Sequence, residues 1–184
     1  MMPDGWVGVV LAGGRSRRMG RDKALLEWQG RTLLDHAITR FKDAGCARTI
    51  VSGDRPEHGG LPDAYPDSGP LGGLHAAGRA CQGCRLVVVA VDMPKLPALW
   101  LRMLAQHESP IGAVHFDGSP LPFSVIATEN VMDMLEARLR DPCASRALSD
   151  WLDAMAAVAL PLPSNADEAL MNFNTPAQWG VMRT

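Results

Sequence analysis

The chain has 184 residues, of which 47% are hydrophobic and 21% are charged, and its formal net charge is -2. This balance is ordinary for a globular protein and excludes the broad positive field with which many proteins bind nucleic acid. No apolar run reaches the roughly 18 residues that a membrane span needs, and the chain does not start with a charged-then-apolar leader. With four scattered cysteines, the sequence predicts a single cytoplasmic domain over residues 1–184, without nucleic-acid or membrane partners.

Strands alternate with helices through the first 110 residues. Strands are expected at Val7–Leu11, Arg48–Ser52 and Arg85–Asp92. Helices are expected within residues 31–45, where Gly45 is the stop signal, and at Leu71–Ala80 and Pro97–Gln106. The stretch from Arg85 is apolar throughout, as a strand covered on both faces should be. This order predicts an α/β fold, with a mostly parallel sheet and helices on both faces.

The last third of the chain is less regular. A strand is expected within residues 119–128, followed by helices within residues 129–139 and 145–155 and a short strand within residues 158–163. A final helix is expected to begin after Thr175 as N-cap, with Pro176 as its first residue.

A basic, glycine-rich loop follows the first strand. Its sequence, LAGGRSRRMGRDK, holds three glycines, five cations and one acid. Such a loop can turn sharply and point consecutive N–H groups at phosphate oxygens. It is not a Walker A motif, because only two residues separate Gly20 from Lys23, and it is not G-x-G-x-x-G, because Gly13 and Gly14 are adjacent. The loop indicates a phosphorylated ligand; the plainer alternative is a solvated basic turn.

This loop closely resembles the signature L-A-G-G-x-S-x-R-M-G-x-D-K of the molybdenum cofactor guanylyltransferases, which share a Rossmann-like nucleotidyltransferase fold. Related cytidylyl- and uridylyltransferases usually read L-A-A-G there. Three later segments agree: DAYPDSGPLGGL resembles D-x-x-P-G-x-G-P-L-x-G, VDMPKLP resembles C-D-x-P-x-L-P, and MNFNTPAQW resembles F-x-N-x-N-T-P. The chain departs from the pattern at Asp67, which replaces a glycine, at Val91, which replaces the cysteine before Asp92, and at Ser52, which stands where many relatives have an asparagine that contacts the base.

The resemblance implies a role for each matching residue. Lys23, Asp92 and Arg18 would be catalytic: Asp92 would bind Mg²⁺, and Lys23 and Arg18 would neutralise the departing pyrophosphate. Mg²⁺ commonly uses one or two carboxylates together with substrate phosphates, so a single aspartate suffices. The residues expected to bind the substrates are Leu11, Ala12, Gly13, Gly14, Lys23, Ser52, Asp63, Asp92, Asn172 and Asn174.

Asn172 and Asn174 are assigned to the pterin substrate, because their amides carry both donors and an acceptor. For Asp63, Asp92 and the two asparagines, the plainer alternative is a turn or helix-capping role. Cys81 and Cys84 have metal-ligand spacing but no second pair, so no metal is expected there.

The implied reaction is transfer of GMP from GTP to molybdenum-molybdopterin, with Mg²⁺ as cofactor and pyrophosphate as the second product. Transient contacts with molybdenum cofactor delivery proteins and molybdoenzymes are expected on the same resemblance. Two alternatives stay open. One is nucleotidyl transfer of another kind, as in a molybdopterin cytidylyltransferase or a sugar-phosphate nucleotidyltransferase. The other is a nucleotide-binding regulator without catalytic activity.

Overall fold

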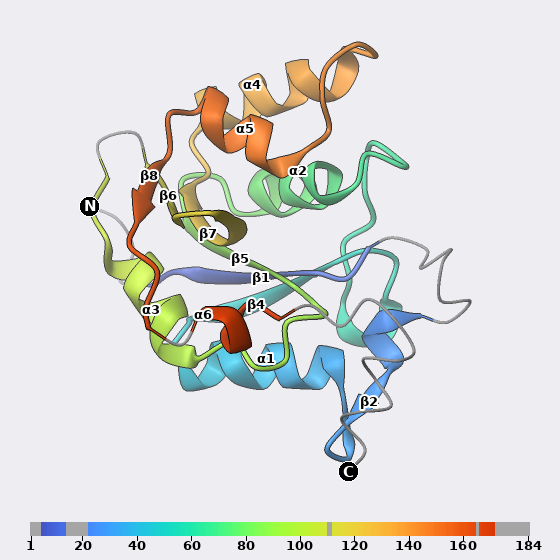
Figure 1. Ribbon diagram of the computed structural model, residues 1–184. Coiled ribbons are helices and arrows are strands. Elements are labelled where there is room, and N and C mark those ends of the chain that lie inside the picture. The colour runs from blue at the N-terminus through green and yellow to red at the C-terminus, as the bar shows by residue number, and fades with distance from the viewer. Residues whose placement is uncertain (1–4, 14–21, 110–111, 165, 172–184) are drawn as a thin grey trace.

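A computed structural model describes residues 5–13, 22–109, 112–164 and 166–171. In these residues the main sheet has six strands in the order β4-β1-β5-β7-β6-β8 (Figure 1). The strands are β1 Val7–Leu11, β4 Arg48–Ser52, β5 Arg85–Ala90, β6 Ala113–Phe116, β7 Ser119–Ile126 and β8 Val158–Leu160. Strand β7 runs antiparallel to both of its neighbours, and the other pairings are parallel.

Helices cover both faces of this sheet. They are α1 Leu33–Asp43, α2 Pro70–Ala80, α3 Ala98–Gln106, α4 Glu129–Arg140, α5 Leu148–Ala154 and α6 Ala166–Ala169. Figure 1 shows α2, α4 and α5 on one side of the sheet and α1, α3 and α6 on the other. Each side has its own buried apolar cluster, so the sheet is covered twice and its central strands are apolar along their length. The predicted α/β class with a mostly parallel sheet is confirmed.

Most expected elements are present, with some differences at their ends. Strand β5 ends at Ala90, so Asp92 lies in the loop beyond the strand and does not close it. The sequence analysis missed β6, α6 and a small hairpin of β2 Glu27–Trp28 and β3 Arg31–Thr32, because short elements have too few residues to show a period. The final helix expected after Thr175 lies outside the described residues.

Local signals explain where α1 begins and ends. The Thr32 side chain accepts a hydrogen bond from the Asp35 N–H at 3.0 Å, which caps the first turn. Gly45 adopts φ 82°, a left-handed conformation that is open to glycine and ends the helix as the sequence predicts. No helix in the described part of the chain is long and apolar enough to span a bilayer.

Helix α1 packs unusually close to β1 because Gly8 has no side chain. A Cβ atom at Gly8 would lie 2.5 Å from Cγ of the fully buried Phe41. We therefore expect Gly8→Ala to lower the free energy of unfolding by about 1–3 kcal/mol through overpacking, as measured by urea denaturation. In a Phe41→Leu background the same change should cost less, and equal costs in the two backgrounds would show that the contact is not tight.

Candidate functional site

The register of β1 brings three chain segments together at one edge of the sheet. Strand β1 lies between β4 and β5, and Leu11 is level with Ser52 on one side and Ala90 on the other. Beyond the strand, the Ala12 N–H donates to the Ser52 carbonyl at 3.1 Å, and the Val91 N–H donates to the Leu11 carbonyl at 3.3 Å. The carboxyl ends of parallel strands form the usual ligand-binding edge of such sheets. The predicted site segments therefore meet where a ligand would bind.

The centre of this edge is an ion pair between Lys23 and Asp92. The Lys23 ammonium donates to Asp92 Oδ2 at 2.7 Å, and the two side chains are 21% and 12% exposed. The sequence places these residues 69 positions apart, and the fold joins them. A cation and a carboxylate in contact at a ligand-binding edge can act together on a phosphate group. The ammonium can bind the phosphate oxygens, and the carboxylate can bind a metal ion.

Arg55 fixes the segment that carries Lys23. Its guanidinium donates to both carboxylate oxygens of Asp22 and, at 3.0 Å, to the Ala12 carbonyl. Asp22 in turn accepts from the Ala24 N–H at 3.0 Å and caps the short 3-10 turn η1, Lys23–Leu25. These hydrogen bonds from Arg55 hold the pKa of the Asp22 carboxyl below its usual value, against the opposing effect of partial burial. Arg55 therefore ties both ends of the glycine-rich loop to each other.

Ser52 and Asp63 form a second polar pair beside the first glycine of the loop. The Ser52 hydroxyl donates to Asp63 Oδ1 at 3.4 Å. Ser52 is only 2% exposed, and a Cβ at Gly73 would come within 2.0 Å of its Oγ, so the hydroxyl is enclosed by α2. Burial raises the pKa of the Asp63 carboxyl, and the Ser52 hydrogen bond partly offsets this effect. The buried Ser52 hydroxyl thus helps to hold the Asp63 carboxylate in position.

The free side of the Asp63 carboxylate lies among glycines. A Cβ at Gly13 would lie 3.6 Å from Asp63 Oδ2, and one at Gly72 would lie 3.2 Å from the same atom. The site therefore keeps space around this oxygen, next to the start of the glycine-rich loop. A half-buried carboxylate with one oxygen so placed can accept hydrogen bonds from a bound ligand.

An ionic network holds the segment after Asp63. The Tyr65 hydroxyl donates to Glu136 Oε1 of α4 at 2.9 Å, and Arg79 Nη2 of α2 donates to Glu136 Oε2 at 2.6 Å. The hydrogen bonds from Tyr65 and then Arg79 lower the pKa of Glu136 to about 2. Glu136 therefore stays ionised at neutral pH and anchors the loop between Asp63 and α2.

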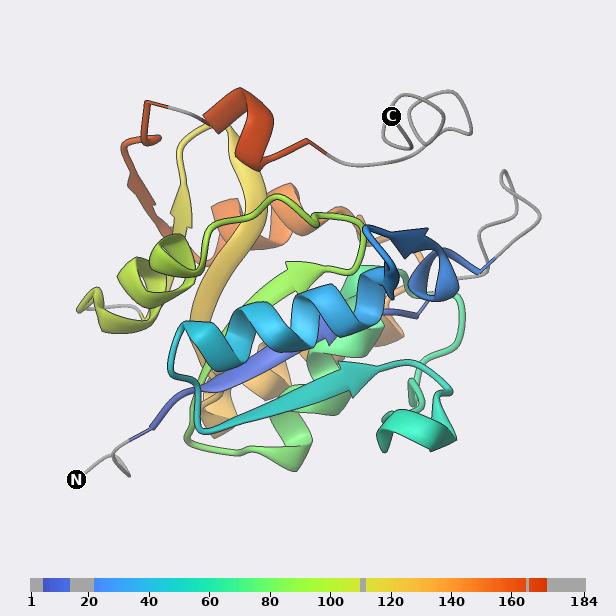
Figure 2. The same cartoon turned by 90° about the horizontal axis from the view of Figure 1, so that it is seen from below.

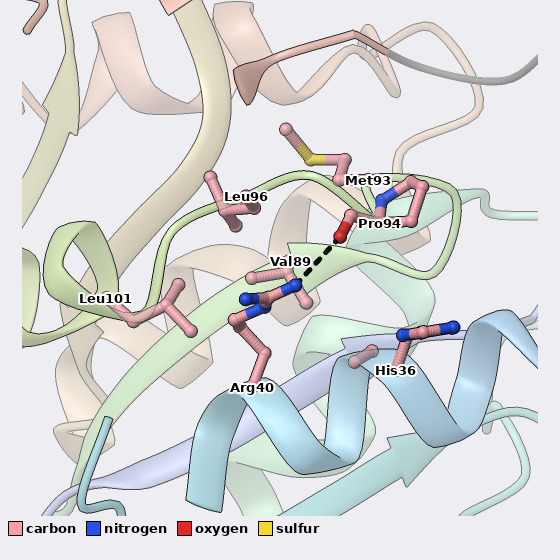
Figure 3. Close-up of a pocket in the computed structure, with 8 residues that line it drawn as sticks. His36, Arg40, Val89, Met93, Pro94, Leu96 and Leu101 are labelled. Atoms are coloured by element: carbon pink, nitrogen blue, oxygen red, sulfur yellow. Dashed lines mark hydrogen bonds between the residues drawn. The ribbon is translucent and has the colours of Figure 1, made fainter. Parts of the chain in front are cut away.

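Arg40 of α1 supports the loop that carries Asp92. Figure 3 shows its guanidinium donating to the Pro94 carbonyl, at a distance of 3.1 Å. The cavity beneath this loop measures about 10 Å³, which is room for about one water molecule. Met93 and Leu96 are buried in the same core cluster, so the loop is held by packing as well as by Arg40. The position of Asp92 thus depends on α1.

The donor set at this edge fits a metal that is shared with a substrate. In the part of the chain that the structure describes, no group of three or more His, Cys, Asp or Glu side chains could hold a metal ion by itself. Asp92 offers one carboxylate at the binding edge. Mg²⁺ suits such a place, because it usually keeps several waters and binds through one or two carboxylates and substrate phosphates.

Several residues of the predicted site lie outside the described residues: Gly14, Arg18, Asn172 and Asn174. The structure brings together the described ones, namely Leu11, Ala12, Gly13, Lys23, Ser52, Asp63 and Asp92. Sequence analysis missed the supporting residues Asp22, Arg40, Arg55 and Tyr65, although Arg55 lies three residues after Ser52, which it singled out. Cys81 and Cys84 are free thiols, and Arg48 donates to the sulfur of Cys81.

A mostly parallel sheet with a lysine–aspartate pair and a glycine-rich loop at its carboxyl edge defines a nucleotide-binding α/β protein. Residues 8–158 match the family described as the MobA-like NTP transferase domain. The chain belongs to this family and is a nucleotidyltransferase.

Individual relatives agree with this assignment. The chain is 40% identical over 178 residues to the molybdenum cofactor guanylyltransferase of Xanthomonas euvesicatoria pv. vesicatoria, covering 95% of this chain and 92% of the relative. It is 34% identical over 183 residues to that of Rhizobium johnstonii, covering 92% and 87%.

Among solved structures, molybdopterin-guanine dinucleotide biosynthesis protein A from Archaeoglobus fulgidus has a TM-score of 0.77 at 22% identity, with 96% of each chain covered. A 2-C-methyl-D-erythritol 4-phosphate cytidylyltransferase from Thermus thermophilus has a TM-score of 0.66 at 15% identity, with 95% of each covered, and shows the same fold.

The Asp22–Arg55 pair should make stability depend on pH. A lowered native pKa means that the pair stabilises the fold above the ordinary carboxyl pKa, and that this contribution disappears as the pH falls through the lowered value. Since 35% of the Asp22 side chain is exposed, screening limits the effect to about 0.5–1 kcal/mol. Asp22→Asn should lower the free energy of unfolding by this amount at pH 7, and the difference from wild type should shrink below about pH 4.

The exposed Asp43, at the far end of α1, provides the matched control. Asp43→Asn should leave stability within about 0.5 kcal/mol of wild type at both pH values. A loss in Asp22→Asn that stays constant from pH 7 to pH 3 would contradict a role for the charged pair.

Proposed function

We propose that the chain, as one domain over residues 1–184, transfers GMP from GTP to the terminal phosphate of molybdenum-molybdopterin, giving the guanine dinucleotide form of the cofactor and pyrophosphate. The observation that carries this proposal is the Lys23–Asp92 ion pair at the carboxyl edge of β1 and β5. The similarity to proteins named molybdenum cofactor guanylyltransferase supports the choice of substrates. The reaction is expected in the cytoplasm, consistent with four free cysteines.

The reaction needs positioning and charge stabilisation more than proton transfer. A phosphate monoester has a second pKa of about 6, so the attacking oxygen of the acceptor is already ionised at neutral pH. This oxygen bonds to the α-phosphorus of GTP, and the bond from that phosphorus to the bridging oxygen of pyrophosphate breaks. No general base is required, which suits a site whose central groups are a lysine and an aspartate.

Each residue of the pair has a separate task in this proposal. Lys23 binds the β- and γ-phosphates and stabilises the negative charge that develops on the departing pyrophosphate. Arg18 shares this task. Asp92 is the residue that would hold Mg²⁺, and the bound ion would supply charge neutralisation at the reacting phosphates.

The other assigned residues orient the two substrates. The backbone of Leu11, Ala12, Gly13 and Gly14 binds the nucleotide next to the phosphates. Asp63, supported by Ser52, accepts hydrogen bonds from N–H groups of the guanine base. Asn172 and Asn174 hydrogen-bond the pterin. Cofactor delivery proteins and molybdoenzymes are proposed as transient partners that bring the acceptor and take the product.

Pyrophosphate release tests the proposal directly. With molybdopterin and Mg²⁺, the wild-type protein should release pyrophosphate from GTP and much less from CTP, ATP or UTP. Asp92→Asn should reduce the turnover number about 10²- to 10³-fold while leaving the melting temperature close to wild type. Asp43→Asn, which removes an exposed carboxylate at the C-terminal end of α1, is the control and should retain full activity.

Other outcomes of this assay favour the alternatives. A preference for CTP, or turnover with sugar phosphates as acceptor, would point to a different nucleotidyltransferase. Binding of GTP without any release of pyrophosphate would point to a regulator. Full activity of Asp92→Asn in Mg²⁺ would remove Asp92 from the metal site.

Ser52 provides a sharper test of base recognition. If its hydroxyl supports Asp63, Ser52→Ala should raise the KM for GTP about fivefold, equivalent to about 1 kcal/mol, with little change in kcat. The pKa of Asp63 should rise further without this donor, so the pH below which the KM for GTP increases should move upward.

Ser124→Ala is the matched control, because the buried Ser124 hydroxyl donates to the Leu104 carbonyl at 2.9 Å, away from the site. It should reduce stability and leave the KM for GTP unchanged. If both variants alter the KM for GTP equally, the effect of Ser52 comes from loss of stability and not from base recognition.

A further inference from the structure

An open pocket of about 440 Å³ lies beside the loop that carries Asp92. It is lined by Trp28 and Gln29 of the hairpin, Lys95 of the loop after β5, and Glu168 and Ala169 of α6. Figure 2 shows this loop passing between α6 and the hairpin. The volume is within the range of small-molecule sites, which is about 300–1,000 Å³. Arg40 and Arg55, which support the loops at the carboxyl edge of the sheet, do not line it.

The aromatic wall of the pocket is fixed in place. Gln29 and Gly30 have φ values of 48° and 76°, which make the tight turn that presents Trp28. The Trp28 ring lies 4.8 Å from the His36 ring of α1, and a His36 ring nitrogen is hydrogen-bonded to the Trp28 carbonyl at 2.7 Å. An aromatic ring whose position is already fixed loses little entropy when a flat ligand stacks on it.

The cationic wall of the pocket is Lys95. Its ammonium donates to Glu168 Oε1 at 2.9 Å, and the Glu168 side chain is 70% exposed. A lysine ammonium has three N–H donors, so this contact leaves capacity for an anionic ligand. The hydrogen bond from Lys95 lowers the pKa of Glu168, so at neutral pH the glutamate is ionised and competes with any anion for the lysine.

Lys95 is only three residues from Asp92 in the sequence, so this pocket lies close to the sheet edge that holds the Lys23–Asp92 pair. Three residues span at most about 11 Å, so Lys95 cannot lie farther than this from Asp92 along the backbone. A lysine side chain covers part of that distance. A phosphate held by Lys95 would therefore lie near the edge at which the acceptor phosphate must attack the α-phosphorus of GTP.

We propose that this pocket, the acceptor pocket, binds the acceptor of nucleotidyl transfer, with Trp28 stacking on its flat heteroaromatic ring and Lys95 pairing with its phosphate monoester. The inference rests on the proposed function, and it assigns residues that the motif comparison leaves without a role. Glu168 is a positioning residue: it holds Lys95 at the pocket and weakens its grip on phosphate. Lys95 and Glu168 thus act in opposite directions on acceptor binding.

Titration calorimetry with two stable probes tests the pocket without any need for turnover. The probes are 6-hydroxymethylpterin and its phosphate monoester. Wild type should bind the phosphorylated pterin more tightly. Lys95→Met should weaken binding of this probe about fivefold to tenfold and leave the hydroxymethyl probe unchanged. Glu168→Gln should strengthen binding of the phosphorylated probe about twofold to threefold.

The ring and the ion pair are controlled separately. Trp28→Leu should weaken binding of both probes by a similar factor, because each carries the same ring. Asp133→Asn breaks an exposed ion pair with Arg79, whose atoms lie 2.8 Å apart, and should change the affinity of neither probe. If Lys95→Met and Glu168→Gln change affinity in the same direction, or wild type binds neither probe, the proposal is wrong.

Steady-state turnover separates this inference from the proposed function. In wild-type protein that releases pyrophosphate from GTP, Lys95→Met should raise the KM for molybdopterin about fivefold and leave the KM for GTP unchanged. If wild type is active and neither KM changes, only the acceptor pocket is refuted. If wild type releases no pyrophosphate, the proposed function fails, and the calorimetric result stands as a measurement of pterin binding alone.

Discussion

The parallel pairing of β1 with β4 and β5 is the constraint on which the rest of the structure depends. Because Leu11 is level with Ser52 and Ala90, three loops leave the sheet at the same height. A shift of one residue in either pairing would turn every side chain of that strand to the other face and expose the apolar residues of two cores. The burial of both faces therefore fixes the register, and the register fixes which loops meet.

Side chains next to the binding groups then hold each loop in place. Arg55 links the Asp22 segment to the Ala12 carbonyl, Arg40 reaches from α1 to the Pro94 carbonyl, and Tyr65 is anchored on Glu136. Two of these contacts come from arginines that bind backbone carbonyls, and such bonds depend little on the identity of the loop side chains. The side chains that hold the loops are therefore different from those that present polar groups to a ligand.

The sequence was sufficient to predict the central part of the fold and the family to which the chain belongs. The long apolar run of β5 and the helical spacing of apolar residues in α1 are strong enough to predict these elements, and the glycine-rich loop has a specific pattern. Lys23 and Asp92 were both expected to be catalytic, but their contact was not predicted. Contact between residues so far apart in the sequence follows from the strand order, which the sequence does not show. The contacts of Arg40, Arg55 and Lys95 were not predictable, because arginines and lysines have no periodic signal that indicates their partners before the fold is known.

The ion pair between Lys23 and Asp92 also has a thermodynamic consequence. A divalent cation that approaches Asp92 alone must displace a bound ammonium, so its intrinsic affinity is reduced by the strength of that contact. A polyphosphate that draws the ammonium toward itself exposes the carboxylate and brings further oxygen ligands with it. If Asp92 holds Mg²⁺ as proposed, metal and nucleotide should promote each other's binding by the same factor, which is heterotropic linkage created by one salt bridge.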